Sequence, residues 1–187
     1  SGTLPDSFNQ SLAVAIPKKG TERRYICLCP VICKVMERLV VNRLKHVLEI
    51  NCNLHKNQAA FRTGRSTMDN LAILETAAKA AISRSHHLIA VFFDLAKAYN
   101  STWHHLILNN LRLLNIDGKM RKFVENFLRQ RKFRLWNKGI LSEQRTLENG
   151  VPQGSVISVF LFLVAINDVL YLYNLSLIHI SEPTRPY

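Results

Sequence analysis

The feature that most constrains this chain is an apolar run that begins at Val156. It is rich in Val, Leu, Ile and Phe, and Asn167, Asp168 and Asn174 interrupt it. The uninterrupted part is ~11 residues, well short of the ~20 that a membrane-spanning helix needs. A helix that is apolar on all sides must be surrounded by protein. We therefore expect a buried core helix, no membrane partner, and Ser155 as the cap of that helix.

Helical periodicity is clearest in the first half of the chain. Between residues 31 and 48, apolar side chains recur at helical spacing and charged residues lie between them, which predicts an amphipathic helix. Ser66 with Asp69 resembles a capping box, and it opens a second predicted helix that ends near Ser83. Two further helical patterns follow, at Trp103–Leu114 and Lys119–Arg131.

Strand signals occupy the second half. The continuous apolar run Leu88–Phe93 is too short for a helix and predicts a strand buried on both faces. Phe133–Trp136 and Ser142–Leu147 predict a strand pair that turns at Lys138-Gly139, and Asn149-Gly150 is a turn signal. Helices and strands alternate irregularly, which favours an α+β fold with helices on one side of a sheet.

The charge of the chain is unusually positive. Twenty-five Lys and Arg stand against 13 Asp and Glu, which gives a net charge of +12. This excess favours a polyanionic partner, because neutralised phosphates release counterions. A solvated basic surface without a partner is the alternative.

Four cysteines occur, at Cys27, Cys29, Cys33 and Cys52. The spacing of the first two suits neither a zinc knuckle nor a CxxC redox pair. Cys52 with His55 leaves a mixed metal site open. Reduced, buried thiols in an intracellular protein are the favoured interpretation.

Asp94 directly follows the apolar run, where an unpaired carboxylate is costly to bury. From position alone two interpretations compete. The carboxylate forms a salt bridge or helix cap in the next segment, or it is a metal ligand at the end of a strand. Carboxylates placed in this way can hold the Mg²⁺ ions of phosphoryl transfer.

The segment FFDLAKAYNSTWH, residues 92–104, resembles the first catalytic motif of reverse transcriptases from non-LTR retrotransposons, particularly the jockey-like elements of insects. The resemblance implies that Asp94 is the catalytic metal ligand and the Leu95 carbonyl a second contact. It also implies that Ala98 and Tyr99 bind the nucleotide, with Tyr99 as the steric gate against a 2′-hydroxyl. Asn100 stands where the family usually has a second Asp.

The segment NGVPQGSVIS, residues 149–158, is similar to the family's next motif. The resemblance implies that this segment grips template and primer. Glycines let the backbone approach a base pair closely, a proline stiffens the loop, and the Gln153 amide lies near the incoming nucleotide. The residues implied in the grip are Gly150, Pro152, Gly154 and Ser155.

Two upstream blocks are similar to the family but depart from it. Residues 57–67 resemble the fingers motif, in which Arg62 and Arg65 would bind the triphosphate by charge-assisted bonds. Two solvated arginines are the alternative. Ala60 stands where the family has Gly, and Tyr25 replaces the proline that follows Arg24 in another block.

The segment 175–187 looks like a translated sequencing adapter, which is excluded from fold reasoning. The chain contains no adjacent Asp-Asp pair, whereas the family's aspartate hairpin would lie just downstream. Because Asp94 alone cannot hold two Mg²⁺ ions, we expect this chain to be inactive as a polymerase. A chain that barely folds, with an open sheet edge, is a further alternative.

The resemblance implies a right-hand polymerase fold of fingers plus partial palm, with helices packed on an antiparallel sheet. The expected domains are a fingers-like region (1–84), a partial palm (85–174) and a non-native tail (175–187). The implied function is RNA-directed DNA polymerisation in the full-length parent, in the nucleus and cytoplasm. It would use two Mg²⁺ ions, an RNA template, a DNA primer and deoxynucleoside triphosphates. The alternative is a non-catalytic, basic nucleic-acid-binding module.

Overall fold

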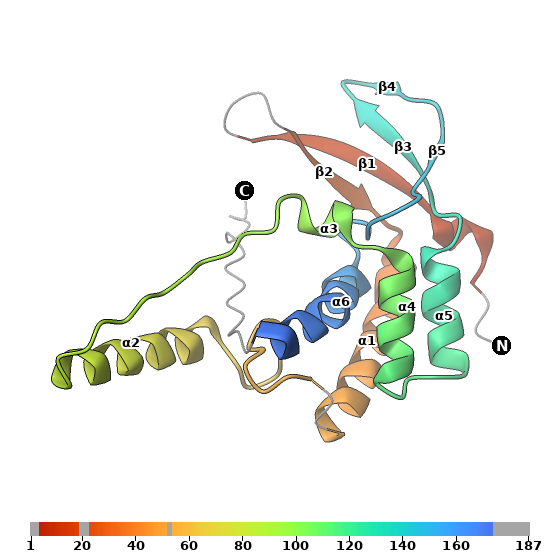
Figure 1. The fold of residues 1–187 in the computed structure, drawn as a ribbon. Helices are drawn as coiled ribbons and strands as arrows, with labels where there is room; N and C mark the ends of the chain where they lie inside the picture. The colour runs from red at the N-terminus through yellow and green to blue at the C-terminus, as the bar shows by residue number, and fades with distance from the viewer. Residues whose placement is uncertain (1–3, 19–22, 52–53, 174–187) are drawn as a thin grey trace. The chain divides into compact units, whose positions relative to one another are not determined.

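The structure, a computed structural model, describes residues 4–18, 23–51 and 54–173 (Figure 1). The chain forms two compact units. The first consists of Ser1–Asn53 and Lys97–Ala165, and the second of Leu54–Ala96 and Ile166–Tyr187. The predicted foreign tail and Cys52 lie outside the described residues. The domain boundaries expected from the sequence stay predictions.

The first unit contains a sheet with the strand order β2-β1-β3-β4, and β5 also pairs with β3. β1 runs antiparallel to β2 but parallel to β3, and Val14 lies opposite both Ile26 and Trp136. The expectation of an antiparallel sheet is therefore wrong. A long connection through several helices separates β1 from β3, which lets the chain re-enter the sheet in the same direction. The elements are η1 (Asp6–Asn9), β1 (Gln10–Pro17), β2 (Arg23–Leu28), β3 (Lys132–Asn137), β4 (Ile140–Leu141) and β5 (Arg145–Thr146).

The strand pair predicted around Lys138-Gly139 is confirmed. These two residues have φ angles of 49° and 86°. Positive φ at both central residues is the mark of a type I′ turn, whose twist suits a two-residue hairpin. The hairpin brings Trp136 opposite Leu141.

The helices of the first unit enclose an apolar core. α6 provides much of it, and Ile157, Leu161 and Val164 are each 0% exposed. The predicted core helix is confirmed, and no helix among the described residues is long and apolar enough to cross a membrane. The helices are α1 (Val31–Ile50), α3 (Ala98–Ser101), α4 (His104–Leu113), α5 (Lys119–Leu128) and α6 (Val156–Tyr173), the last residues of which belong to the second unit.

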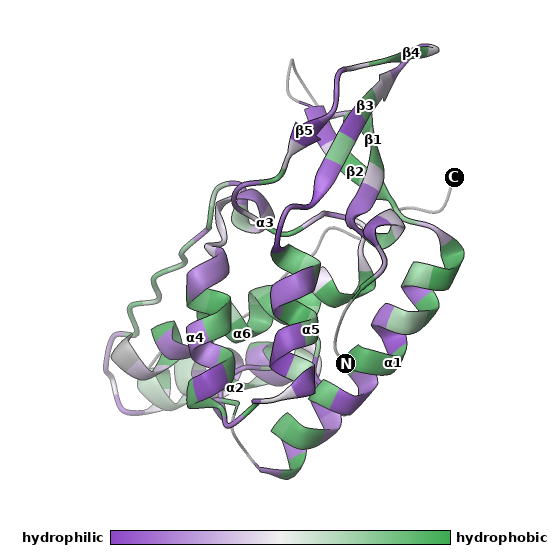
Figure 2. Ribbon diagram, turned by 90° about the vertical axis from the view of Figure 1, so that its right-hand side faces the viewer, coloured by the Kyte–Doolittle hydropathy of each residue, from purple (hydrophilic) through white to green (hydrophobic). Residues whose placement is uncertain are grey.

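α1 has the amphipathic pattern that its sequence predicts. Figure 2 shows hydrophobic and hydrophilic residues alternating along it. The residues that it buries are Cys33, Glu37, Val41, Leu44 and Leu48. Their spacing of three or four places them on one face, so one carboxylate, that of Glu37, lies on the apolar face.

The second unit contains α2 (Thr67–Ser83) and the end of α6. The predicted capping box is confirmed, because the Asp69 carboxylate accepts the Ser66 backbone N–H at 2.6 Å. The Asn167 side chain, which interrupts the apolar run, accepts the His55 backbone N–H at 2.9 Å. Asn167 therefore ties the end of α6 to the residues before α2.

The prediction of a buried strand at Leu88–Phe93 is wrong for this structure. The segment has no regular secondary structure and follows α2 as an extended stretch (Figure 1). Phe92 and Phe93 are each 76% exposed. A strand buried on both faces needs partner strands on its two edges, and none of the described strands pairs with this segment.

The core of the first unit can be tested on α4, where Leu111 is 0% and Leu113 60% exposed. Leu111→Ala is expected to lower the free energy of unfolding by about 2–5 kcal/mol, because it leaves a cavity. Leu113→Ala, the same chemical change, should cost about 0.5 kcal/mol or less. Urea denaturation measures both, and equal costs would contradict this packing.

Candidate functional site

The 149–155 loop, which contains the second motif, is bonded to the segment that follows the first. The Gly150 N–H donates to Thr102 O and the Val151 N–H to Tyr99 O, both at 2.8 Å. His104 Nε2 lies 2.6 Å from Gly150 O. A carbonyl only accepts, so Nε2 carries the proton in this contact. Backbone hydrogen bonds therefore join two segments that the family resemblance assigns to one site.

The other end of the loop is fixed to β2. The Cys27 N–H donates to Gln153 O at 2.6 Å. Because β2 is the edge strand of the sheet, its outward N–H groups are free to donate to a carbonyl of this kind. The loop therefore covers part of an open sheet edge while its Gln153 side chain stays half-buried.

Two positions in this loop require glycine. Gly150 has a φ of 81° and Gly154 a φ of 109°, values that residues with a Cβ rarely adopt. A Cβ at Gly150 would lie 2.7 Å from Asn100 O, and one at Gly154 would lie 2.6 Å from Cys27 O. Both contacts are with backbone, which cannot move aside as a flexible side chain does. The sequence predicts that these glycines let the backbone approach a base pair. In this structure they let it approach the protein's own backbone.

The Glu37 carboxylate joins α1 to the start of α6. Its Oε2 accepts the Ser155 hydroxyl at 2.6 Å, the Val156 N–H at 2.7 Å and the Ile157 N–H at 3.4 Å. The prediction that Ser155 caps the helix is wrong, because the Ser155 hydroxyl donates its hydrogen bond to Glu37. The acceptor at the first N–H groups is Glu37, and a carboxylate there also complements the positive end of the helix dipole.

Sequence reasoning missed Glu37 as a site residue. The signal that could have found it is its position on the apolar stripe of α1, where an unpaired charge is disfavoured. A second missed residue is Arg131, 1% exposed. Its Nη2 donates to Cys29 Sγ at 3.3 Å, and its guanidinium carbon lies 4.5 Å from the centre of the Phe127 ring.

Tyr99 packs within the first unit. Its ring centre lies 5.3 Å from that of Phe162 on α6, and burial raises the pKa of its hydroxyl. Ala98 opens α3 beside it and is half-buried. The ring is thus held by aromatic packing next to the 149–155 loop, and its role as a steric gate stays a prediction.

The remaining predicted site residues belong to the second unit. Asp94 and Leu95 are exposed in the irregular segment before α3. The Arg62 guanidinium donates to the backbone carbonyls of His55 and Gln58, at 3.2 and 3.4 Å. Arg65 is exposed. The structure therefore gathers Ala98, Tyr99 and the 149–155 loop in the first unit, and holds Arg62 within its own loop in the second.

A pair of magnesium ions needs more oxygen ligands than Asp94 alone supplies. Mg²⁺ takes octahedral oxygen ligands, with one or more carboxylates among them. No group of three or more His, Cys, Asp or Glu side chains in the described part of the chain could hold a metal ion. Asp94 offers one carboxylate and does not fit a two-ion site by itself.

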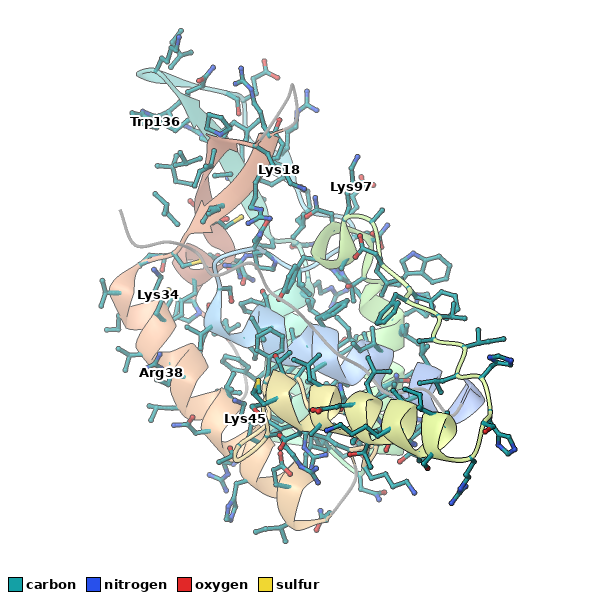
Figure 3. The ribbon with its side chains drawn as sticks, turned by 90° about the vertical axis from the view of Figure 1, so that its left-hand side faces the viewer. Lys18, Lys34, Arg38, Lys45, Lys97 and Trp136 are labelled. Atoms are coloured by element: carbon teal, nitrogen blue, oxygen red, sulfur yellow. The ribbon has the colours of Figure 1, made fainter. Side chains whose placement is uncertain are left out.

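A row of basic side chains follows α1, with Lys34, Arg38 and Lys45 on the same side of the helix (Figure 3). Their spacing of four and seven residues explains this arrangement. The row borders the buried face that contains Glu37. It gives the first unit a cationic surface suited to phosphate groups.

Glu37→Ala is expected to lower the free energy of unfolding by about 1–3 kcal/mol or more, because buried donors at the start of α6 lose their acceptor. Glu143→Ala, at an exposed position outside the strands, should change it by no more than about 0.5 kcal/mol. Thermal and urea denaturation measure the difference. A neutral Glu37→Ala variant would show that the bond to α6 does not stabilise the unit.

Gly150→Ala and Gly154→Ala should destabilise the chain more than Gly139→Ala does. Gly139 also has a positive φ, 86°, but a Cβ there meets nothing within 4 Å. Its substitution isolates the cost of the left-handed conformation, about 1–2 kcal/mol. Any additional loss of unfolding free energy in the two loop variants measures the cost of the close contact with backbone atoms. Equal losses for all three variants in urea denaturation would contradict that contact.

Known proteins resemble this chain over most of its length. A family model described as reverse transcriptase (RNA-dependent DNA polymerase) matches residues 16–181. The chain is 28% identical over 174 residues to the RNA-directed DNA polymerase from mobile element jockey of Drosophila melanogaster, covering 90% of this chain and 19% of that protein. It is 29% identical over 172 residues to the probable RNA-directed DNA polymerase from transposon BS of the same fly, covering 89% and 19%.

A third relative is the retrovirus-related Pol polyprotein from type-1 retrotransposable element R2 of Nasonia vitripennis. It is 28% identical over 177 residues, which cover 90% of this chain and 17% of that protein. The chain thus spans about a fifth of the length of these curated relatives. Because the family match includes most of its residues, this chain belongs to the reverse transcriptase (RNA-dependent DNA polymerase) family.

Proposed function

We propose that this chain provides the fingers and part of the palm of an RNA-directed DNA polymerase from a non-LTR retrotransposon. The observation that carries the proposal is the bonding of the 149–155 loop to Tyr99 and Thr102. Two motifs that are far apart in sequence, and that the family resemblance assigns to one nucleotide site, share backbone hydrogen bonds. The mixed sheet with helices is the frame that supports them.

Each part of this frame has a role that its geometry supports. The Tyr99 ring, held against Phe162, presents a rigid surface to the sugar of a nucleotide and excludes a 2′-hydroxyl by overlap. The 149–155 loop, fixed at both ends, orients the Gln153 amide. Positioning of this kind contributes to polymerase rates because the reacting groups are held before reaction. Arg62 and Arg65 are proposed as triphosphate contacts in the whole protein.

The proposed substrates are an RNA template, a DNA primer and deoxynucleoside triphosphates, and the proposed cofactor is Mg²⁺. In the whole protein Asp94 and the Leu95 carbonyl would be ligands, completed by carboxylates beyond those described. A bound divalent ion neutralises the charge of the transferred phosphate. The basic row on α1 supplies a surface for the nucleic-acid backbone.

Asp94→Asn in the full-length parent protein is expected to abolish primer extension, because an amide lacks the charge that binds the ion. The assay uses an oligo(dT) primer on a poly(A) template, with deoxythymidine triphosphate and Mg²⁺. Asp117→Asn is the matched control, since Asp117 forms a surface ion pair with Arg121 at 3.0 Å. Full extension by the Asp94 variant would refute the role of Asp94.

The second candidate, a non-catalytic nucleic-acid-binding module, is favoured by the +12 charge. The isolated 187-residue chain should bind primer–template without extending it, and binding should weaken steeply with salt. Extension by this chain would contradict the expected inactivity. A parent protein that binds but never extends would replace the polymerase proposal with the binding module.

A further inference from the structure

The Leu88–Phe93 run leaves both its side chains and its backbone uncovered. All six of its residues are exposed, and Ile89 reaches 86%. In the described part of the chain, no backbone hydrogen bond involves residues 87–93. An extended segment with unpaired N–H and C=O groups can pair with another strand, and its apolar side chains favour such an association.

The composition of the run selects a second copy of the same chain as the occupant. The run contains no charged residue, no glycine and no proline. Four of its six residues are β-branched or aromatic, which are the types that strands prefer. Short segments of this kind pair with identical segments, because no like charges meet and no residue interrupts the hydrogen bonds. Every copy of the chain carries the matching strand.

One edge of the run is open along its whole length. In an extended segment, the backbone groups of successive residues point to opposite edges. The His86 N–H, on the edge of the even-numbered residues, donates to Ala81 O in α2 at 2.8 Å. That edge therefore begins at a group that is already bonded. The edge that contains the backbone groups of Ile89 and Val91 is open, so we expect it to receive the second copy.

Two-fold symmetry restricts how two identical antiparallel strands can pair. Side chains that lie opposite each other are on the same face of the sheet, and faces alternate along each strand. A two-fold axis perpendicular to the sheet keeps every residue on its own face. Odd-numbered residues can therefore lie opposite odd-numbered ones only, and one residue lies on the axis opposite its own copy. The central residues of the run, Ala90 and Val91, are the two candidates.

The arrangement with Ala90 on the axis matches apolar residues across the strands. Leu88 then lies opposite Phe92 of the second copy, and Ile89 lies opposite Val91. Aromatic and β-branched side chains form favourable pairs of this kind across antiparallel strands. The small Ala90 side chain meets only itself, so the axis is not crowded.

The polar residues that flank the run choose between the two arrangements. With Ala90 on the axis, His86 lies opposite Asp94 of the second copy, and an imidazole N–H donates well to a carboxylate. With Val91 on the axis, Asp94 would face Leu88, which offers no hydrogen bond and would desolvate the charge. Charge complementarity therefore favours the arrangement centred on Ala90.

We propose that two copies of this chain associate by antiparallel pairing of their Leu88–Phe93 segments, with Ala90 on the two-fold axis and His86 of each copy opposite Asp94 of the other. The proposal goes beyond the proposed function and does not rest on it. In this chain the pairing engages Asp94, the residue that the proposed function assigns to the metal.

Sedimentation of the 187-residue chain tests the association. Between ~5 and ~200 μM, the average mass should rise from the 21.4 kDa of one chain towards twice that value. Ile89→Lys should weaken the dimer at least about tenfold, because a lysine on a strand edge opposes pairing. Ile140→Lys, the same change at a residue that is 74% exposed, should leave it intact. A chain that stays monomeric, equal effects of the two variants, or open-ended assemblies larger than a dimer would overturn the proposal.

Cysteine cross-linking tests the position of the axis. Ala90→Cys places a thiol opposite its own copy, at a separation from which a disulfide forms. Mild oxidation should therefore give a covalent dimer on non-reducing gels. Ala96→Cys, also exposed, lies far from its own copy in this arrangement and should stay monomeric, as should the native chain. Equal cross-linking of both variants would show that the strands are not paired around Ala90.

A charge exchange tests the ends of the strand pair. Asp94→Lys should weaken the dimer, whereas Glu143→Lys, at an exposed position outside the run, should not. The double variant His86→Asp with Asp94→His restores the same contacts in the opposite sense and should dimerise like the native chain. A dimer that ignores Asp94→Lys would refute this arrangement. Circular dichroism establishes that each variant is folded. These measurements use neither primer nor nucleotide, so their outcome is independent of the polymerase assay.

Discussion

The first unit depends on one carboxylate. Glu37 lies on the buried face of α1 and accepts the Ser155 hydroxyl and the first N–H groups of α6. A buried carboxylate is stable only when its charge is satisfied, and the unpaired N–H groups at a helix start satisfy it. This bond fixes where α6, the most apolar element, begins. It also fixes the end of the 149–155 loop, because the loop runs directly into α6.

The loop in turn is bonded to two further segments. Its Gly150 end is bonded to Thr102, and its Gln153 carbonyl accepts the Cys27 N–H of the sheet edge. Glycine at both ends permits backbone contacts that any Cβ would prevent. The conformation of this motif is therefore set by the protein around it. A loop held in this way loses little entropy on binding a ligand.

The two units differ in how completely their apolar residues are covered. In the first, α4, α5 and α6 enclose side chains that are almost fully buried. In the second, the Leu88–Phe93 run is exposed, although its sequence is typical of an internal strand. Apolar periodicity reports which residues prefer burial, but a strand forms only where neighbouring strands supply hydrogen bonds. The predicted buried strand is therefore wrong for this structure, in which the run is exposed and has no regular secondary structure.

The sequence alone determined the local elements and the chemistry-bearing motifs. Periodicity and capping residues predicted α1, α2 and α6, and the Lys138-Gly139 turn predicted the hairpin, because these signals depend on residues close together in the chain. The order of the motifs around Asp94 and Gly150 indicated the family. Only the tertiary structure decided the parallel pairing of β1 with β3 and the capping of α6 by Glu37. Each of these joins residues that are distant in sequence, and no local pattern encodes which distant partner a buried charge or an open strand edge will meet.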